Sequence, residues 1–345
     1  LHSSTMKNTE KLNLRRELGL ASAVSLAAGV MIGSGIFMSP QFVLVYVGSS
    51  GASLIIWAVC GVVCMCTAFS YAEIGTIIRE SGGNYIYILR IYGPCLAFVL
   101  SFTTMFLMKP LSIIAGSLSF AKYAVAPFYP GCTPPILVVK CIAAACVLVI
   151  STINVLNVRF AMASQVVFMV AKLVGLMIIV IGGIITVAQG NCESLCNSKS
   201  AFADAKLSIS TVGMALYQCL WSYAGWSNIN NVIEEVKRPE VRQSSYVLQI
   251  IFLFCDRNKV LGGWGWVMSI AAALSSFGSL NGSFFSGGRV CYVAAREGHM
   301  PDILAMAHMH RLTPSPALIF NTVIALIVLI PGDFQAIVNF LRYCA

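Results

Sequence analysis

Long apolar stretches alternate with short polar segments along the whole chain. The apolar stretches cover residues 19–47, 51–77, 94–121, 135–155, 160–189, 208–233, 264–295 and 316–341. A helix needs about 20 mainly apolar residues to cross the hydrocarbon core of a bilayer, which is roughly 30 Å thick. Each stretch is long enough, so the pattern predicts an all-α membrane protein with many spans.

The composition agrees with a membrane protein. Of the 345 residues, 58% are hydrophobic and 10% are charged, whereas about 25% of the residues in a soluble domain are charged. The net charge of +9 comes from Lys and Arg between the spans, where such residues mark cytoplasmic loops. We therefore expect a lipid bilayer and no nucleic acid as partner, and the Cys and His spacing predicts no metal site.

The basic segments also predict an orientation in the plasma membrane. Lys and Arg before the first span place residues 1–18 in the cytoplasm. Counting spans from there makes the loop 190–207 extracellular and the basic segment 237–242 cytoplasmic. The basic segment 289–311 should be cytoplasmic too.

The span count fails between these two cytoplasmic segments, because an even number of crossings must separate them. Only the span 264–295 and the apolar stub SYVLQIIFLFC (245–255) lie there. At about 1.5 Å per residue the stub crosses only about half of the bilayer. We expect that a seventh span is shortened or lost; the alternative is a re-entrant or interfacial segment.

The first span contains a weak point for a helix, because MIGSGIFMSP (31–40) places Gly33, Ser34 and Gly35 side by side. A second weak point, Ala224–Gly225, interrupts the span 208–233. In hydrocarbon a broken helix survives only where it is buried or lines a cavity. Its free ends attract the carboxylate and ammonium groups of a substrate. The alternative is that the small residues form a packing face for a neighbouring helix.

Matched breaks in the first and sixth spans predict a transporter core of two five-helix repeats with inverted topology. The first repeat covers residues 19–189. The second, residues 208–345, is incomplete: it holds span six, the stub of span seven, and spans eight and nine.

Four long motifs carry a resemblance to a known family. They are MIGSGIFMSP (31–40), SGGNYIYILRIYGP (81–94), LWSYAGWSNINNVIEEVKRP (220–239) and AAREGHMPDILAMAHMHRLTPSPALIF (294–320). Together they resemble the amino acid–polyamine–organocation transporters, and among them the light subunits of the heteromeric amino-acid transporters. The b(0,+)-type and aromatic-preferring members are the most similar, and the resemblance runs over nearly the whole chain.

The resemblance implies sodium-independent exchange of amino acids by alternating access, without a cofactor. The first break would bind the α-carboxylate and α-amine of the substrate through Met31, Ile32, Gly33, Ser34 and Gly35. Trp221 matches an aromatic gate over the substrate. Ala224 stands where cystine- and cation-handling relatives hold a carboxylate, so a cationic side chain would lack a counter-ion. We therefore expect neutral substrates, with aromatic and large apolar amino acids as the first candidates.

Two lysines lie inside predicted spans. Lys172 is a functional candidate by its position, and in related sodium-independent members a lysine here resembles a stand-in for sodium. The alternative is that its side chain reaches back to the membrane surface. Lys109 precedes Pro110 and is the weaker candidate, since it can be a helix-kink residue paired with a carbonyl oxygen.

Cys132 lies in FYPGCTPP, a predicted extracellular loop. A cysteine outside the cell without a local mate suggests an intermolecular bond, and the resemblance implies a disulfide to a single-span glycoprotein heavy subunit. Cys192 and Cys196 are also predicted to be outside, where they form a local bridge or remain free.

Two functions follow from these expectations. The first is a transporter light subunit. The second is a non-transporting short form that at most binds the heavy subunit, because span seven and the last three helices of the family are expected to be absent. An enzyme is not expected, since the paired carboxylates Glu234 and Glu235 lie at a helix end without a nucleophile.

Overall fold

The computed structural model describes residues 19–33, 35–129, 132, 134–188, 201–202, 205, 207–235, 265–307 and 313–332. The predictions for the stub at 245–255, the basic segment 237–242, Ser34, Cys192 and Cys196 lie outside the described residues. All regular structure within the described part is helical.

The helices follow the predicted spans closely. In chain order they are α1 (Leu20–Met31), α2 (Gly35–Val47), α3 (Ser50–Ile77), α4 (Asn84–Tyr92), α5 (Pro94–Thr103), the π-helix η1 (Thr104–Met108), α6 (Lys109–Val125), the 3₁₀-helix η2 (Ala126–Phe128), α7 (Ile136–Leu156), α8 (Val158–Ala188), α11 (Ile209–Tyr223), the 3₁₀-helix η3 (Trp226–Glu235), α14 (Gly265–Arg296), the 3₁₀-helix η6 (Asp302–Ala305) and α15 (Ser315–Leu329). The prediction of an all-α protein is confirmed.

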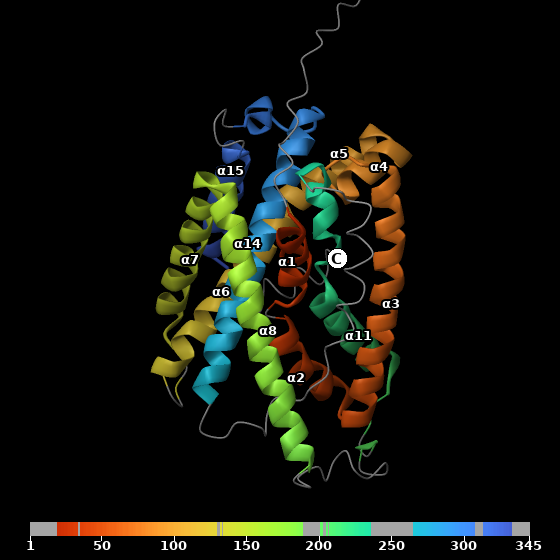
Figure 1. Cartoon of the computed structure of the whole chain (residues 1–345), viewed down its shortest axis with the longest axis vertical. Helices are drawn as coiled ribbons and strands as arrows, with labels where there is room; N and C mark the ends of the chain where they lie inside the picture. The colour runs from red at the N-terminus through yellow and green to blue at the C-terminus, as the bar shows by residue number, and fades with distance from the viewer. Residues whose placement is uncertain are drawn as a thin grey trace, which may run out of the picture.

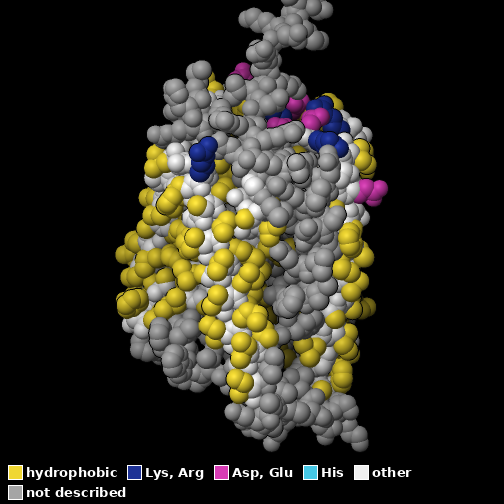
Figure 2. Space-filling view, in the orientation of Figure 1, with side chains coloured by type: hydrophobic (Ala, Val, Ile, Leu, Met, Phe, Trp, Pro, Cys, Tyr) yellow, Lys and Arg dark blue, Asp and Glu magenta, His cyan; other side chains and the backbone are white. Residues whose placement is uncertain are grey.

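Several helices have the length and composition of membrane spans. In the described part, Ser50–Ile77, Pro94–Phe128, Ile136–Leu156 and Val158–Gly182 are long and apolar enough to cross a bilayer. Only 24–39% of their most apolar windows is buried, which leaves apolar surface on each helix that suits contact with lipid. Figure 2 shows hydrophobic side chains over the middle of one face, with charged side chains gathered toward one end.

Helix α15 ends before the last predicted span does. The apolar run 316–341 is not a single helix, because α15 ends at Leu329. Pro331 follows, and proline has no N–H to continue the helical hydrogen bonds. The Gly332 N–H still donates to the Val328 carbonyl oxygen at 3.1 Å, and residues 333–341 of the predicted span lie outside the described residues.

Both predicted breaks are present at the middle of the molecule. The first span divides into α1 and α2, and the sixth divides into α11 and η3. Figure 1 shows α1 and α2 following one another along the long axis, with α11 beside α2. Since η3 packs against α1 and α11 packs against α2, the two broken spans run alongside each other.

Helix α14 is the central element of the bundle. It packs against α1, α6, α7, α8, α15 and η3, and in Figure 1 it runs between α6, α8 and α1. Small residues allow these close approaches: a Cβ atom on Gly282 would lie 2.5 Å from Val30, and one on Gly288 would lie 2.5 Å from Leu318. Because neighbours cover α14 on several sides, its small residues are important for letting the other helices pack closely against it.

Candidate functional site

The first break leaves helical geometry after Met31. Ile32 has φ −79° and ψ 70°, and the N–H of Gly33 donates to the carbonyl oxygen of Met31 at 2.9 Å. Helix α2 then begins at Gly35. The break therefore exposes carbonyl groups at the end of α1 and amide groups at the start of α2, which attract a cation and an anion respectively.

Serines of α14 donate to the carbonyl groups at the end of α1. Ser275 Oγ donates to the Ile32 oxygen at 3.0 Å and to the Gly33 oxygen at 3.3 Å. Ser279 Oγ donates to the Val30 oxygen at 3.0 Å. These hydrogen bonds satisfy carbonyl groups that the interrupted helix leaves without intrahelical partners.

The sequence did not single out these serines, although it carried a signal for them. Ser275, Ser279 and Ser283 recur every four residues in an apolar stretch, and residues with that spacing share one face of a helix. A polar stripe on a buried helix indicates a polar partner, which here is the broken span.

Lys172 of α8 lies against the same break. Its side chain is 1% exposed, and its ammonium group donates to the carbonyl oxygen of Gly29. Gly278 makes room for it, since a Cβ atom there would lie 3.2 Å from the Lys172 nitrogen. The side chain points inward and does not reach a membrane surface.

The second break begins where α11 ends. Ala224 is extended, with φ −62° and ψ 148°, and Gly225 has φ +123°, a conformation that side chains disfavour. Asn228 Nδ2 donates to the Gly225 carbonyl oxygen at 3.0 Å. This side-chain amide supports the second interruption as the α14 serines support the first.

The two breaks touch each other through their backbones. A Cβ atom on Gly225 would lie 2.9 Å from the Met31 nitrogen. A Cβ atom on Gly35 would lie 3.0 Å from Ser222 Cα and 3.3 Å from Trp221 Cζ3. Glycine fits both positions, because a side chain there would push the broken helices apart.

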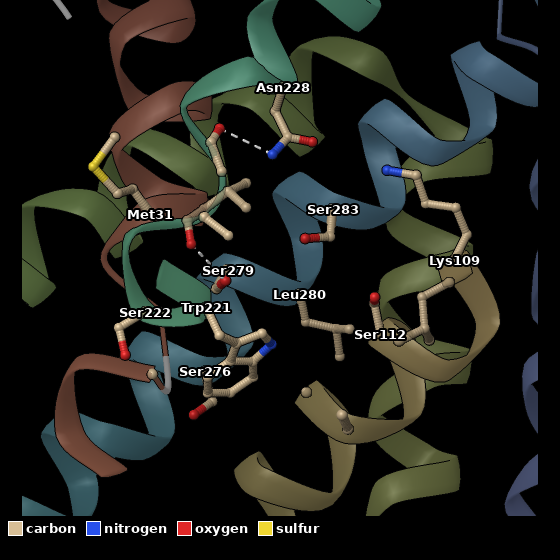
Figure 3. A pocket seen from close by; sticks show the side chains of 18 residues that line it. Met31, Lys109, Ser112, Trp221, Ser222, Asn228, Ser276, Ser279, Leu280 and Ser283 are labelled. Carbon is tan, nitrogen blue, oxygen red and sulfur yellow. Dashed lines mark hydrogen bonds between the residues drawn. The ribbon is translucent and has the colours of Figure 1, made fainter. Parts of the chain in front are cut away.

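A cavity of about 210 Å³ lies at this junction. Of the residues predicted for the site, it is lined by Met31, Gly33, Gly35, Trp221 and Ala224. Ile32 faces away from it and packs in a small apolar cluster with Ala28 and Met169. Figure 3 shows the Trp221 ring lying across the cavity near Leu280.

The remaining walls come from helices far apart in the sequence. α6 contributes Lys109 and Ser112, η3 contributes Asn228, and α14 contributes Ser276 and Ser283. No carboxylate occurs among the described residues that line the cavity, and no cluster of His, Cys, Asp and Glu suited to a metal occurs in the described ranges. The cavity can offer hydrogen bonds, one aromatic ring and one positive charge.

Comparison with known proteins identifies the family of a chain with this site. The amino acid permease family matches residues 18–256 and 258–345. The chain belongs to the amino acid permease family. Its relatives include the b(0,+)-type amino acid transporter 1 of Homo sapiens, which is 40% identical over 96% of this chain and 74% of its own length. The cystine/glutamate transporter of Homo sapiens is 36% identical over 97% and 72%, and the Asc-type amino acid transporter 1 of Mus musculus is 32% identical over 97% and 68%.

These relatives confirm the resemblance that the motifs indicated. They are named as transporters and not as enzymes, which agrees with the expectation from the sequence, and this permease is a membrane protein. The match to the family is interrupted at residue 257. The alignment with the human b(0,+)-type relative covers 361 residues, more than the 345 of this chain, so the relative has residues that this permease lacks.

Ion pairs join η3 of the permease to α14 at one end of the bundle. Arg289 Nε donates to Glu235 Oε1 at 2.8 Å, with side chains 0% and 5% exposed. Arg296 pairs with Glu234 at 3.1 Å, and Glu234 also accepts a hydrogen bond from the backbone N–H of Ser81 at 3.0 Å. The two adjacent carboxylates seen in the sequence therefore have separate arginine partners and form no catalytic pair.

A tyrosine–histidine contact lies at the same end. The Tyr85 hydroxyl is 2.8 Å from His299 Nδ1. Burial, more than the nearby Glu297, raises the pKa of Tyr85 to about 12. The neutral phenol keeps its proton and can donate to the imidazole, which links α4 to the segment after α14.

Cys132 is exposed and follows the 3₁₀-helix η2. Its backbone N–H donates to the carbonyl oxygen of Tyr129 at 3.3 Å, which makes a turn that presents the side chain outward. The thiol is accessible to a partner at the end of the molecule where α6 and η2 finish.

Proposed function

We propose that the permease holds a sodium-independent exchange site for neutral L-amino acids, used in alternating access. The contact between the two breaks carries this proposal. Where Gly225 meets the end of α1, the interrupted ends of two helices face one cavity. Such ends suit the ammonium and carboxylate groups that all amino acids share, with Trp221 covering the side chain.

The substrate class follows from the wall at Ala224. This residue lines the cavity, and its methyl group offers no charge to a cationic side chain. Aromatic and large apolar amino acids are the first candidates because Trp221 and Leu280 supply apolar surface. Lysine and arginine would leave a charge in the membrane without a counter-ion, which is costly.

Lys172 would act as a fixed cation at the first break. Its ammonium group lies on the Gly29 carbonyl oxygen, at the negative end of α1. A bound sodium ion would satisfy the same carbonyl group. A lysine held there permanently would remove the need for a coupled ion.

A second candidate function is a non-transporting form of the permease. Two observations favour it: the family match is interrupted at residue 257, and the relatives have residues that this chain lacks. A lost seventh span would leave the second repeat incomplete. In that case the permease binds a heavy subunit without moving substrate, and we expect this outcome for the 345-residue chain by itself.

The proposed partner is a single-span glycoprotein heavy subunit in the plasma membrane, bound through Cys132. The exposed thiol after η2 supports this partner. The proposed orientation has the N-terminus in the cytoplasm, because the basic residues before α1 favour that side.

Uptake into proteoliposomes distinguishes the two functions. Labelled leucine, phenylalanine, arginine and cystine are offered outside, with or without amino acid inside. Uptake stimulated by internal amino acid would establish exchange and overturn the non-transporting form. Thermal unfolding of the purified chain with and without leucine tests the site separately, and no shift in the midpoint would contradict an amino-acid site at the breaks.

Substitution at Ala224 tests the substrate class. Ala224→Asp supplies a carboxylate inside the cavity, so arginine should then stabilise the protein against heat at least as well as leucine does. Ala224→Asn adds similar volume without charge and is the matched control. An unchanged preference in the aspartate variant would refute the role assigned to this position.

A further inference from the structure

Two buried cysteine side chains meet where α3 packs against α11. Cys60 of α3 is 1% exposed and Cys219 of α11 is 0% exposed. Their thiol groups are hydrogen-bond partners, and both cysteines are free. A single buried cysteine behaves as a small apolar side chain. Two thiols in contact across a helix interface can also react with each other.

The packing of α3 against α11 holds the two thiols together. The Cys60 thiol donates to the Leu216 carbonyl oxygen of α11 at 3.7 Å. In the other direction, the Tyr223 hydroxyl donates to the Trp57 carbonyl oxygen of α3 at 3.4 Å, and the two rings pack edge to face with centroids 5.5 Å apart. Cys219 lies between these contacts, about one turn after Leu216 and one turn before Tyr223. The thiol contact is therefore set by the register of the two helices.

A third buried cysteine, Cys64, lies one turn after Cys60 on the same continuous helix. Cβ atoms four residues apart on a helix are about 5–6 Å apart, whereas a disulfide needs about 3.5–4.5 Å. A bond between these two cysteines would distort α3. Cys219 is on another helix, so small movements of the side chains and helices bring its sulfur to that of Cys60.

Cys219 belongs to a helix that forms part of the cavity wall. Trp221, two residues later, lies across the cavity in Figure 3, and Ser222 lines it as well. Helix α11 packs against both α2 and α3, and the two cysteines share an apolar cluster with Val43 of α2. A covalent bond between α3 and α11 would hold this wall of the cavity in one position.

We propose that Cys60 and Cys219 form a redox modification site, where a peroxide produces a disulfide that holds Trp221 over the cavity and slows substrate exchange. The effect on exchange rests on the proposed function, in which α11 moves when the cavity opens, whereas the disulfide does not depend on it. Because both thiols are buried, the oxidant must be small and uncharged. Hydrogen peroxide meets both requirements.

The reaction is a two-electron oxidation of the thiols. The sulfur of one cysteine gives up its proton, attacks a peroxide oxygen and breaks the O–O bond, which yields a sulfenic acid and one water molecule. The second sulfur then attacks the sulfenic sulfur, so the S–S bond forms and the S–O bond breaks. The leaving hydroxide takes the second thiol proton and becomes another water molecule. A small uncharged dithiol such as dithiothreitol reverses the modification by thiol–disulfide exchange.

Mass spectrometry of the purified, reduced chain tests the site. After treatment with hydrogen peroxide and digestion, we expect a linked peptide that contains Cys60 and Cys219 and is lighter by two hydrogen atoms. Cys60→Ser and Cys219→Ser should each abolish it. Cys64→Ser, which replaces a buried thiol of the same cluster, is the matched control and should leave it in place. Absence of the linked peptide from a sample in which the exposed Cys132 is oxidised overturns the site.

Release of labelled leucine tests the effect on the cavity. Leucine is bound to the reduced chain, half of the sample is oxidised, and both halves are diluted into unlabelled leucine. Oxidation should slow release at least tenfold, and dithiothreitol should restore the original rate. Oxidised Cys219→Ser should release leucine as fast as the reduced chain, which separates the disulfide from oxidation of methionines. Cys60→Ser serves the same purpose if that variant is unstable.

Two further outcomes have different meanings. A linked peptide with unchanged leucine release overturns the effect assigned to α11. A reduced chain that binds no leucine overturns the proposed function together with the effect on exchange, and the linked peptide alone then supports or refutes the disulfide.

Discussion

Gly225 of the second break lies directly against Met31 of the first, with only 2.9 Å between the Met31 nitrogen and the place of a Cβ atom on Gly225. The two interrupted helices are therefore a single structural unit. Neither break can change shape without the other, because no side chain separates them. The geometry of a substrate site at this contact therefore depends on glycine at position 225.

Gly225→Ala should disrupt this unit. The methyl group meets backbone atoms, and the φ of +123° is strained for alanine, so we expect a loss of about 1–3 kcal/mol in stability and a smaller leucine-induced shift of the thermal midpoint. Gly213→Ala is the control, since its Cβ would meet nothing within 4 Å and alanine favours the helix by about 1 kcal/mol. Equal effects of the two changes would contradict the contact between the breaks.

Lys172→Met should loosen α1 from α8. The methionine preserves much of the packing but leaves the buried Gly29 carbonyl oxygen without its donor, which costs about 1–3 kcal/mol. Differential scanning fluorimetry in detergent measures the change. Lys140→Met removes a lysine that donates to a carbonyl oxygen at an exposed position, and it should lower the midpoint much less. A larger effect at Lys140 would show that the buried bond is not important.

Arg289→Met should be among the most destabilising single changes. It leaves Glu235 buried without its arginine, and breaking a buried ion pair from one side costs about 3–5 kcal/mol. Arg90→Met removes an exposed partner of Glu80, with side chains 41% and 39% exposed, and should cost about 1 kcal/mol or less. Both are read from thermal midpoints.

The double variant Arg289→Met with Glu235→Gln separates the ion pair from other roles of the arginine. It removes the stranded charge and should recover part of the stability lost in Arg289→Met. No recovery would mean that the arginine acts mainly through its contact with the Phe285 ring, whose centroid lies 3.4 Å from the guanidinium carbon.

Cys132→Ser should abolish a disulfide-linked complex with the heavy subunit. The two chains are co-expressed and separated on a non-reducing gel, where the unaltered chain should give a heavier band that a reductant removes. Cys95→Ser, which replaces another exposed cysteine, is the control and should leave the band in place. A band that persists in Cys132→Ser would exclude this cysteine as the bridge.

The spans and their two breaks could be predicted from the sequence because each is a local property. A long apolar run indicates a crossing, and Gly-Ser-Gly weakens a helix wherever the chain is packed. The end of α15 at Leu329 was not predicted, because the hydrophobic pattern continues past Pro331 and hydropathy does not register the missing N–H of a proline.

The partners across the bundle were not predictable in the same way. Ser275 and Ser279 could be seen as a polar stripe, but nothing in the hydrophobic pattern indicates that the stripe faces α1. Packing between distant helices depends on their three-dimensional arrangement, which hydropathy does not encode. The orientation of Lys109 was missed for a related reason, since a π-helical turn has no clear signature in the sequence.

The π-helix η1 divides one membrane span into two parts that have different surroundings. Before it, Phe98 and Phe102 are 48% and 50% exposed, in positions that suit contact with lipid tails. After it, Lys109 and Ser112 line the cavity. An extra residue in one turn rotates everything that follows by about 100°. Deleting a single residue from Thr104–Met108 would therefore turn the lysine away from the cavity, while the span lost one residue and kept its hydrophobic character.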